Sequence, residues 1–299
     1  MPNPNENRLP MDPRELANAL RCRFESDAFL GVDALPLRLP RMAAPPPGTP
    51  PPAGRAPVST GRQPATAMRQ PAAPLSSPAN PTIAPLPPRP LVSAEEAAER
   101  RVQLDVIDND EVKPCTRCGL SATRTKTVFG VGRPTARIVF VGEAPGHDED
   151  VSGEPFVGRA GQLLTDMIQK GMGLRREDVY ICNVLKCRPP NNRPPATDEI
   201  ASCRDYLSRQ LAIIRPQVVI ALGVPASQTL LGTKEGIGSL RGRFHDFYPS
   251  GIALVGESIP LMPTFHPAYL LRTPGEKGKS WADLKMVMSL LNIPIPKRT

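Results

Sequence analysis

The chain has 299 residues, enough for one large or two ordinary domains, and its 39 prolines are too many for a single compact fold. Its net charge of +8 favours an acidic partner, but residues 1–92 and residues 93–299 each carry a net charge of +4. The second part is therefore only mildly basic, which excludes a strong overall attraction to nucleic acid. Binding to phosphate would depend on local clusters of Lys and Arg, which are otherwise ordinary solvated charges.

Membrane and secretion signals are not expected. No stretch approaches the ~20 consecutive apolar residues that cross a bilayer. The first twelve residues, MPNPNENRLPMD, lack the charged-then-apolar pattern of a signal peptide. We therefore expect a cytoplasmic, monomeric protein with no membrane partner. In that compartment the six cysteines are expected as reduced thiols or metal ligands and not as disulfides.

The first 92 residues are predicted to be an N-terminal extension. Asp12 and Pro13 form a helix-start signal, and the apolar residues that follow at helical spacing predict a short helix within residues 12–30. Residues 36–90 contain 18 prolines, and this composition predicts a disordered linker. The short helix either docks a partner, such as a replication or repair protein, or has no role.

Residues 93–299 are predicted to be one domain of about 200 residues. Its first helix, 92–107, begins with Ser93 and Glu96 as a capping box, and the helix at 196–216 has Thr197 as its cap. Short apolar runs predict buried strands at residues 136–144, 178–186, 217–223 and 259–267. Further helices are predicted at residues 158–174, 224–232 and 277–293.

Strands that alternate with helices predict an α/β fold, with a mainly parallel sheet covered by helices on both faces. In such folds, binding sites gather beyond the carboxyl ends of the strands. Glu143, Asn183 and His266 stand at the ends of three predicted strands, so we expect them on one rim. Nearby, Asp148 and Asp150 are expected as turn residues.

Four cysteines have the spacing of a metal site. Cys115 and Cys118 form C-x2-C, and Cys187 and Cys203 are separated by fifteen residues. Four thiolates could bind zinc or an iron–sulfur cluster, and the spacing favours neither; a chain without metal is the third alternative. Cys182 lies within a predicted strand and is expected as a small core residue.

Four blocks of sequence, in the same order and setting, resemble the family 4 uracil-DNA glycosylases, which are bacterial and archaeal iron–sulfur enzymes. They are GEAPG at 142–146, GEPFVGRAGQLL at 153–164, VYICNVLKCRPP at 179–190 and FHPAYLLR at 265–272. The resemblance covers about residues 93–293. It implies a three-layer αβα sandwich with a central, mainly parallel four-stranded sheet. It also implies that Cys115, Cys118, Cys187 and Cys203 hold a [4Fe–4S] cluster.

The same resemblance implies a monofunctional enzyme that hydrolyses the N-glycosidic bond of uracil in single- or double-stranded DNA and leaves an abasic site. Phe156 would stack on the flipped-out uracil ring, and Asn183 would read N3–H and O4. The backbone N–H of Ala144 and the side chain of His266 would face O2. A neutral His266 would stabilise the leaving uracil anion.

Two acidic residues complete the implied site. Glu143 would stay ionised, orient the attacking water and favour the positively charged sugar. Glu149 matches a position near uracil C5 and would help to exclude the methyl group of thymine.

The segment HPAYLLR would enter the DNA. Tyr269 or Leu270 would fill the vacated base position, and Arg272 would contact phosphate or the opposite base. In the alternative, Leu270 and Leu271 start a core-facing helix. Further phosphate contacts are expected from two basic clusters, Lys186, Arg188 and Arg193, and Arg241 and Arg243.

Two alternatives have different chemistry. Relatives that bond covalently to the abasic sugar use a histidine in an inserted basic loop, but NNRPPATDE, after KCRPP, contains neither histidine nor insertion. The second alternative is a non-catalytic iron–sulfur DNA-binding protein linked to replication. The presence of Glu143, Asn183 and His266 argues against it. A relative that acts on another deaminated base also remains possible.

Overall fold

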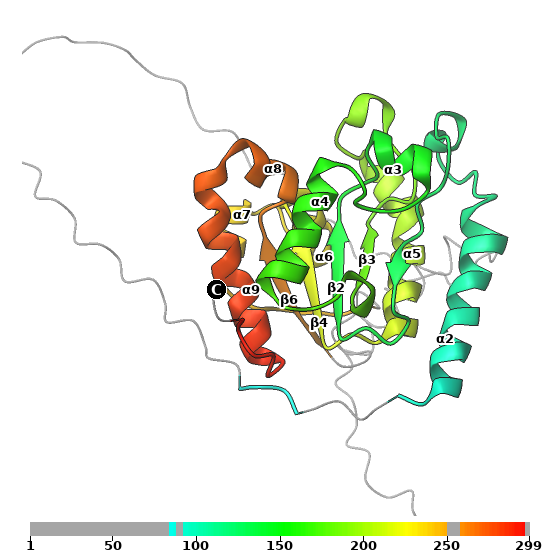
Figure 1. Cartoon of the computed structure of the whole chain (residues 1–299). Coiled ribbons are helices and arrows are strands. Elements are labelled where there is room, and N and C mark those ends of the chain that lie inside the picture. The colour runs from blue at the N-terminus through cyan, green and yellow to red at the C-terminus, as the bar shows by residue number, and fades with distance from the viewer. Residues whose placement is uncertain (1–83, 88–91, 250–257, 297–299) are drawn as a thin grey trace, which may run out of the picture. The chain divides into compact units, whose positions relative to one another are not determined.

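The computed structural model describes residues 84–87, 92–249 and 258–296. The predicted helix at 12–30 and all of the predicted linker except residues 84–87 lie outside the described residues. The described part is a mixed α/β domain whose central sheet has helices on both faces (Figure 1). This architecture confirms the predicted fold class.

The sheet has six strands in the order β1-β3-β2-β4-β6-β5. Their bounds are β1 (Val131–Gly132), β2 (Ile138–Gly142), β3 (Tyr180–Asn183), β4 (Val218–Leu222), β5 (His245–Phe247) and β6 (Ile259–Thr264). The four predicted strands are β2, β3, β4 and β6, and they pair in parallel. The edge strands β1 and β5 pair antiparallel and were not predicted. They are too short to show a periodic pattern.

Helices cover both faces of the sheet. They are α2 (Ala94–Val106), α3 (His147–Ser152), α4 (Arg159–Asp166), α5 (Thr197–Ile214), α6 (Val224–Leu231), α7 (Ile237–Leu240), α8 (Pro267–Arg272) and α9 (Lys277–Leu290). Single turns lie at η1 (Ile107–Val112), η2 (Gly119–Ala122), η3 (Met167–Gly171), η4 (Arg176–Asp178), η5 (Pro190–Asn192) and η6 (Pro274–Glu276). None of the helices in the described ranges is both long and apolar enough to cross a membrane.

Two apolar layers fill the space between sheet and helices. Ile138 and Phe140 of β2 pack with residues of α4 and α9, whereas Val139 and Val141 pack with residues of α2, α5 and α6. Every residue of β2 is buried, as expected for a parallel strand covered on both faces. The polar residues that follow the strands are therefore confined to the sheet edge.

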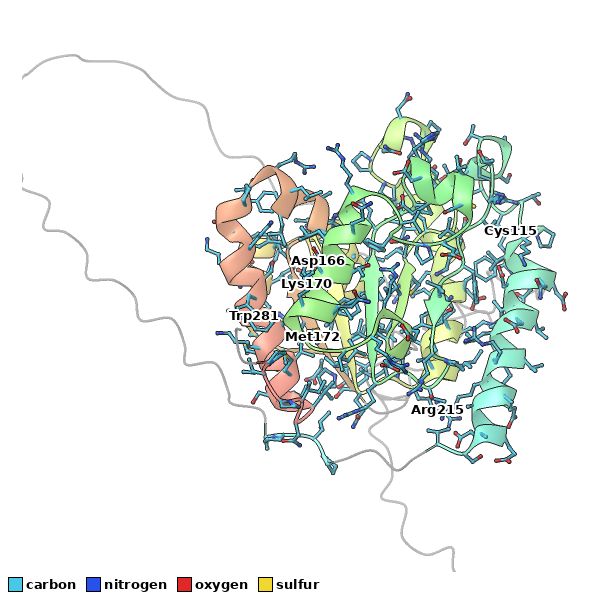
Figure 2. All side chains as sticks on the ribbon, in the orientation of Figure 1. Cys115, Asp166, Lys170, Met172, Arg215 and Trp281 are labelled. Atoms are coloured by element: carbon cyan, nitrogen blue, oxygen red, sulfur yellow. The ribbon has the colours of Figure 1, made fainter. Side chains whose placement is uncertain are left out.

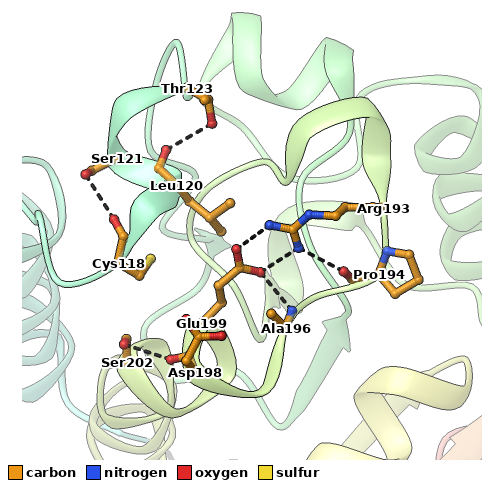
Figure 3. A network of polar contacts seen from close by, with 10 residues as sticks. All are labelled: Cys118, Leu120, Ser121, Thr123, Arg193, Pro194, Ala196, Asp198, Glu199 and Ser202. Carbon is orange, nitrogen blue, oxygen red and sulfur yellow. Dashed lines mark hydrogen bonds and ion pairs between the residues drawn. The ribbon is translucent and has the colours of Figure 1, made fainter.

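The helix starts were predicted with mixed success. The hydroxyl of Ser93 accepts a hydrogen bond from the backbone N–H of Glu96 at 3.1 Å, which confirms the cap of α2. The cap predicted at Thr197 was wrong, because α5 begins after Ala196 and Thr197 is its first residue. The carboxylate of Glu199 accepts the N–H of Ala196 at 2.8 Å and also binds Arg193 (Figure 3). A side chain three residues inside the helix thus replaces the hydroxyl cap.

Residues 84–87, the described part of the predicted linker, pack on the domain. The backbone N–H of Leu86 donates to the carbonyl of Leu290 at 2.8 Å, and the carbonyl of Leu86 accepts from the side chain of Asn292 at 3.1 Å. Leu290 is the last residue of α9, where helical carbonyls lack partners within the helix. These four residues therefore contact the domain, and Leu86 supplies the apolar side chain that packs against its core.

Candidate active site

A cleft of about 470 Å³ opens at the carboxyl ends of β2, β3 and β6. Glu143, Asn183 and His266, the three residues predicted on one rim, all line it. Ala144, Glu149, Phe156, Tyr269 and Arg272 from the sequence prediction also line this cleft, as do Pro145, Gly146, Ala160, Pro189, Asn192, Arg193 and Ala268. The parallel sheet thus brings together Glu143 and His266, which are 123 positions apart in the sequence.

Asn183 supplies a buried hydrogen-bond acceptor. It is the last residue of β3, and it is 1% exposed. Its Oδ1 atom is buried and accepts no hydrogen bond from the described residues. Leaving a buried polar atom unpaired costs about 1–3 kcal/mol, so such an atom in a cleft indicates a missing ligand. Gly142 pairs with Asn183 across the sheet, and a β-carbon there would come within 2.3 Å of Oδ1.

Phe156 lies beside Asn183 in a backbone conformation that is unusual for its residue type. Its φ angle is 56°, in the left-handed region. The ring is 6% exposed, and its centroid lies 5.6 Å from that of His266. The Nη2 atom of Arg176 donates to the carbonyls of Pro155 at 2.8 Å and Phe156 at 3.1 Å. Strain of this kind persists only where surrounding contacts hold it, and it clusters at functional sites.

His266 is the residue before α8, and its ring caps that helix. Its Nδ1 atom accepts a hydrogen bond from the backbone N–H of Ala268 at 3.1 Å, so the ring proton is on Nε2. Burial, with a smaller contribution from the charge of Arg272, lowers the pKa of His266 to about 4. The imidazole is therefore neutral at pH 7, with Nε2–H as its donor.

The two glutamates of the cleft have different surroundings. Burial raises the pKa of Glu143, and its carboxylate accepts no hydrogen bond from the described residues. The carboxylate of Glu149 accepts three backbone N–H groups, those of Gly146 at 3.1 Å, Val157 at 3.0 Å and Gly158 at 3.1 Å. Glu143 is thus available to a ligand, whereas Glu149 joins two loops of the cleft wall.

The segment HDEDVS, expected as a turn, is the helix α3. Asp150 is 2% exposed and accepts the backbone N–H of Thr125 at 2.9 Å. The prediction of Asp148 and Asp150 as turn residues was therefore wrong. Six residues are too few to show helical periodicity, so the sequence carried no signal for this helix.

Leu270 was proposed for insertion into DNA, but it is 1% exposed and lies in the interior. The neighbouring Leu271, which the alternative placed in the core, is 41% exposed. The two side chains point in different directions because α8 packs against α4 with only one of its faces. Tyr269 stacks on Phe265, with ring centroids 4.9 Å apart, and lines the cleft with the exposed Arg272.

Four of the basic residues expected to bind phosphate have partners within the protein, and one of them is Arg188, whose Nε donates to Oδ1 of Asn192 at 2.8 Å. Lys186 is 1% exposed and donates to the carbonyl of Asn183, so the phosphate role predicted for it was wrong. Arg193 binds both carboxylate oxygens of Glu199 (Figure 3). Arg241 binds both oxygens of the fully buried Asp283. Lys186 and Arg241 are largely buried, so these two support the fold and not a phosphate contact. The side chain of Arg193 is paired but 43% exposed.

Cys115, Cys118, Cys187 and Cys203 line one small hollow, away from the cleft. Cys115 lies in the loop that follows α2 and η1 (Figure 2), whereas Cys187 follows β3 and Cys203 belongs to α5. Burial raises the pKa of Cys187 to about 11 and also raises that of Cys203. Arg124 donates to the sulfur of Cys187 at 3.3 Å. Cys182 is buried in the core, as predicted.

Among the described residues, no three His, Cys, Asp or Glu side chains are placed to hold a single metal ion. The four cysteines nevertheless line one common hollow.

Comparisons with known proteins agree with this geometry. A model of the uracil DNA glycosylase superfamily matches residues 129–285. The type-4 uracil-DNA glycosylase of Thermotoga maritima is 50% identical over 173 residues, which cover 58% of this chain and 85% of that protein. The chain belongs to the type-4 uracil-DNA glycosylase family. The type-4 enzyme of Archaeoglobus fulgidus is 45% identical over 184 residues, 60% of this chain and 89% of its own length. The type-4 enzyme of Saccharolobus solfataricus is 44% identical over 193 residues, which cover 63% of this chain and 87% of that protein.

Three residues that support the site were not singled out for this role from the sequence, although Gly161 and Lys186 lie within the quoted motifs. Arg176, Lys186 and Gly161 contact the backbone of Phe156 or Asn183. The supporting role of each residue depends on a contact that forms only when the chain folds. A glycine three residues into a predicted helix was the one available signal, because Gly there is unfavourable without a close contact.

Proposed function

We propose that this protein removes uracil from DNA by hydrolysing the N-glycosidic bond, which leaves an abasic site. The observation that carries the proposal is the unpaired, buried Oδ1 of Asn183 in the cleft that Phe156 and Glu143 also line. The N3–H group of uracil can donate a hydrogen bond to this unpaired acceptor. The amide N–H₂ of Asn183 is then directed to O4. Cytosine has an acceptor at N3 and a donor at C4, so the same amide rejects it.

The base is held by stacking and by donors at O2. Phe156 presents a fixed aromatic ring to the plane of uracil, since its backbone is held by Arg176. The backbone N–H of Ala144 and the Nε2–H of His266 face O2. Glu149, which joins two loops of the cleft wall, is assigned to the position near C5, where it would help to exclude the methyl group of thymine.

The reaction breaks the bond between C1′ of the sugar and N1 of the base. The electron pair passes to uracil, where much of the charge reaches O2, and a neutral Nε2–H donor stabilises it. Such preorganised donors contribute about 3 kcal/mol each. Ionised Glu143 orients the water whose oxygen bonds to C1′, accepts the water's proton and favours the cationic sugar. Burial raises its pKa, which makes it a better base than an exposed glutamate.

The cysteine hollow fits a [4Fe–4S] cluster held by Cys115, Cys118, Cys187 and Cys203. The supporting observations are the hollow that all four cysteines share and the cations Arg117, Arg124 and Lys186 that line it. These cations offset the negative charge of thiolates. When bound, the cluster crosslinks the segment before β2 to the loop after β3 and to α5. No step of the hydrolysis uses it.

DNA is the partner of the cleft mouth, in single- or double-stranded form. Tyr269 and Arg272 line the mouth, and Leu271 is the exposed apolar side chain of α8. We assign Tyr269 or Leu271 as the side chain that fills the vacated base position. Arg272 and Arg188 are assigned as the residues that contact phosphate. Residues 1–92 are assigned as an extension that docks a replication or repair protein, beside the glycosylase domain at 93–299.

Cleavage of an end-labelled oligonucleotide with one deoxyuridine tests the function, with hot alkali after incubation to break abasic sites. Scission at uracil, none at a thymine control and a strong loss in His266→Ala are the expected results. A protein with intact iron and no scission would contradict the proposal and favour a non-catalytic DNA-binding role or another damaged base.

A further inference from the structure

Lys186 is buried between the cysteine hollow and the base cleft. It comes three residues after Asn183 and directly before Cys187, and it lines the hollow. Its side chain is among the largest of those that are fully buried. A buried ammonium group is costly unless polar partners surround it. Its partners therefore indicate what the protein gains from keeping a lysine here.

Two oxygen atoms accept hydrogen bonds from Nζ of Lys186. They are the backbone carbonyl of Asn183 at 2.8 Å and the Oε1 atom of Gln210 at 2.5 Å. Gln210 belongs to α5 and is itself fully buried. Its Nε2 atom donates to the carbonyl of Phe129 at 3.0 Å and to the hydroxyl of Tyr180 at 3.2 Å. Lys186 is thus fixed by α5 and fixes the backbone of Asn183 in turn.

No Asp or Glu among the described residues forms an ion pair with Lys186. The acidic groups that act on it from further away are the thiols of Cys182, Cys187 and Cys203 and the carboxylate of Asp108, and Cys187 and Cys203 line the same hollow as Lys186. A charge without a carboxylate partner is unusual for a buried lysine. The lysine therefore connects two places that are otherwise separate, the cysteine hollow and the residue that reads the base.

We propose that Lys186 is a positioning residue for base recognition, which holds Asn183 in place from the side of the cysteine hollow. The inference rests on the proposed function of Asn183. A shift of about 1 Å in a positioned group can lower a rate about 100-fold. Loss of the Nζ bond to the carbonyl of Asn183 frees the backbone next to its amide, so the preference for uracil over cytosine falls.

A double-mutant cycle separates positioning from general stabilisation. The four proteins are the full chain, Lys186→Met, Asn183→Ala and the double variant, each with its iron per chain measured. The first readout is the affinity for oligonucleotides with cytosine or 2′-fluoro-2′-deoxyuridine, in which the fluorine slows cleavage. The second is KM and kcat on deoxyuridine.

Lys186→Met is expected to lower the preference for uracil about 10-fold or more and to raise KM more than it lowers kcat. In the Asn183→Ala background the same change should add less than about 2-fold, because the residue it positions is gone. Lys170→Met is the control, since Lys170 is exposed on η3 and pairs with Asp166 at 2.8 Å (Figure 2). It should behave like the parent.

Two results would overturn the inference. One is an iron-loaded Lys186→Met protein that prefers uracil over cytosine as strongly as the parent does. The other is a loss of this preference that is equally large with Asn183 and with Asn183→Ala. If Lys186→Met does not fold, Gln210→Leu removes the second acceptor of Nζ and enters the same cycle, with the same expected signs. If the parent protein shows no preference for uracil, the proposed function itself is contradicted. If the parent and the Lys186→Met variant prefer uracil equally, only the inference on Lys186 is contradicted.

Discussion

Gly161 lies directly against the backbone of Phe156. A β-carbon on Gly161 would come within 1.8 Å of the carbonyl oxygen of Phe156 and within 2.7 Å of its Cα. Backbone atoms cannot move aside as a flexible side chain can. The conformation of the stacking residue therefore depends on a glycine in the third position of the following helix, α4.

Gly161→Ala is expected to displace Phe156 and to lower kcat/KM on deoxyuridine at least 10-fold. Gly278→Ala is the matched control, because Gly278 also lies near the start of a helix and a β-carbon there meets no atom within 4 Å. Alanine should stabilise α9 by up to about 1 kcal/mol. Steady-state kinetics and thermal unfolding of both variants check this. Equal activity in the two variants would contradict the role of Gly161.

Arg176 should also act on Phe156, because it donates a hydrogen bond to the carbonyl oxygen that Gly161 approaches. Arg176→Met removes the donors to the carbonyls of Pro155 and Phe156 and to the hydroxyl of Thr165. We expect kcat/KM to fall about 10-fold, since the strained φ of Phe156 then lacks its support. Arg175→Met is the control, because Arg175 is exposed and pairs only with Glu177 and Asp178. A parental rate in Arg176→Met would show that Phe156 needs no such support.

Glu143 should set the acidic limb of the rate profile. Its pKa is raised by burial, so its carboxylate becomes protonated at a higher pH than an exposed glutamate would. Activity should fall as the pH drops through this raised pKa. Glu143→Gln should lower kcat about 100-fold or more and remove the limb. Single-turnover rates measured across pH report both the loss of rate at low pH and the effect of the substitution. If the rate of the glutamine variant still falls at low pH, a group other than Glu143 causes that fall.

His266 should make stability depend on pH in a defined window. Its folded pKa of about 4 is below the ordinary value of 6.5, so the unfolded chain binds more protons between these values. Its contribution is fully present above about pH 6.5 and is lost as the pH falls towards 4. His266→Asn should flatten this part of the curve of unfolding free energy against pH. Denaturant unfolding at several pH values tests it, and an unchanged slope would count against a buried neutral histidine.

Loss of a cysteine ligand should reduce both iron content and stability. Cys187→Ser and Cys203→Ser are expected to lose most of the iron and to unfold at lower temperature, because the crosslink between the loop after β3 and α5 is gone. Cys182→Ala is the control, since Cys182 is buried in the core and does not line the hollow. It should keep the iron. Full iron in Cys203→Ser would remove that residue from the ligand set.

The sequence by itself determined the central strands and the residues at their ends. Parallel strands buried on both faces are continuous apolar runs, so β2 and β4 were visible without any partner. Because such strands end at one edge of the sheet, Glu143, Asn183 and His266 could be placed on one rim. The cap at Ser93 was also predictable, since its contact spans only three residues.

Only the tertiary structure decided which polar side chains line the cleft and which are buried behind it. Lys186 binds Gln210, 24 positions away in the sequence, and Arg241 binds Asp283, 42 positions away. All four are polar residues of types that usually lie on the surface, so the sequence did not predict that they form two pairs inside the fold. The choice between Leu270 and Leu271 depended on the face that α8 turns to α4. Local spacing specifies strands, caps and motifs, whereas burial and pairing arise from contacts between distant segments, which no local pattern encodes.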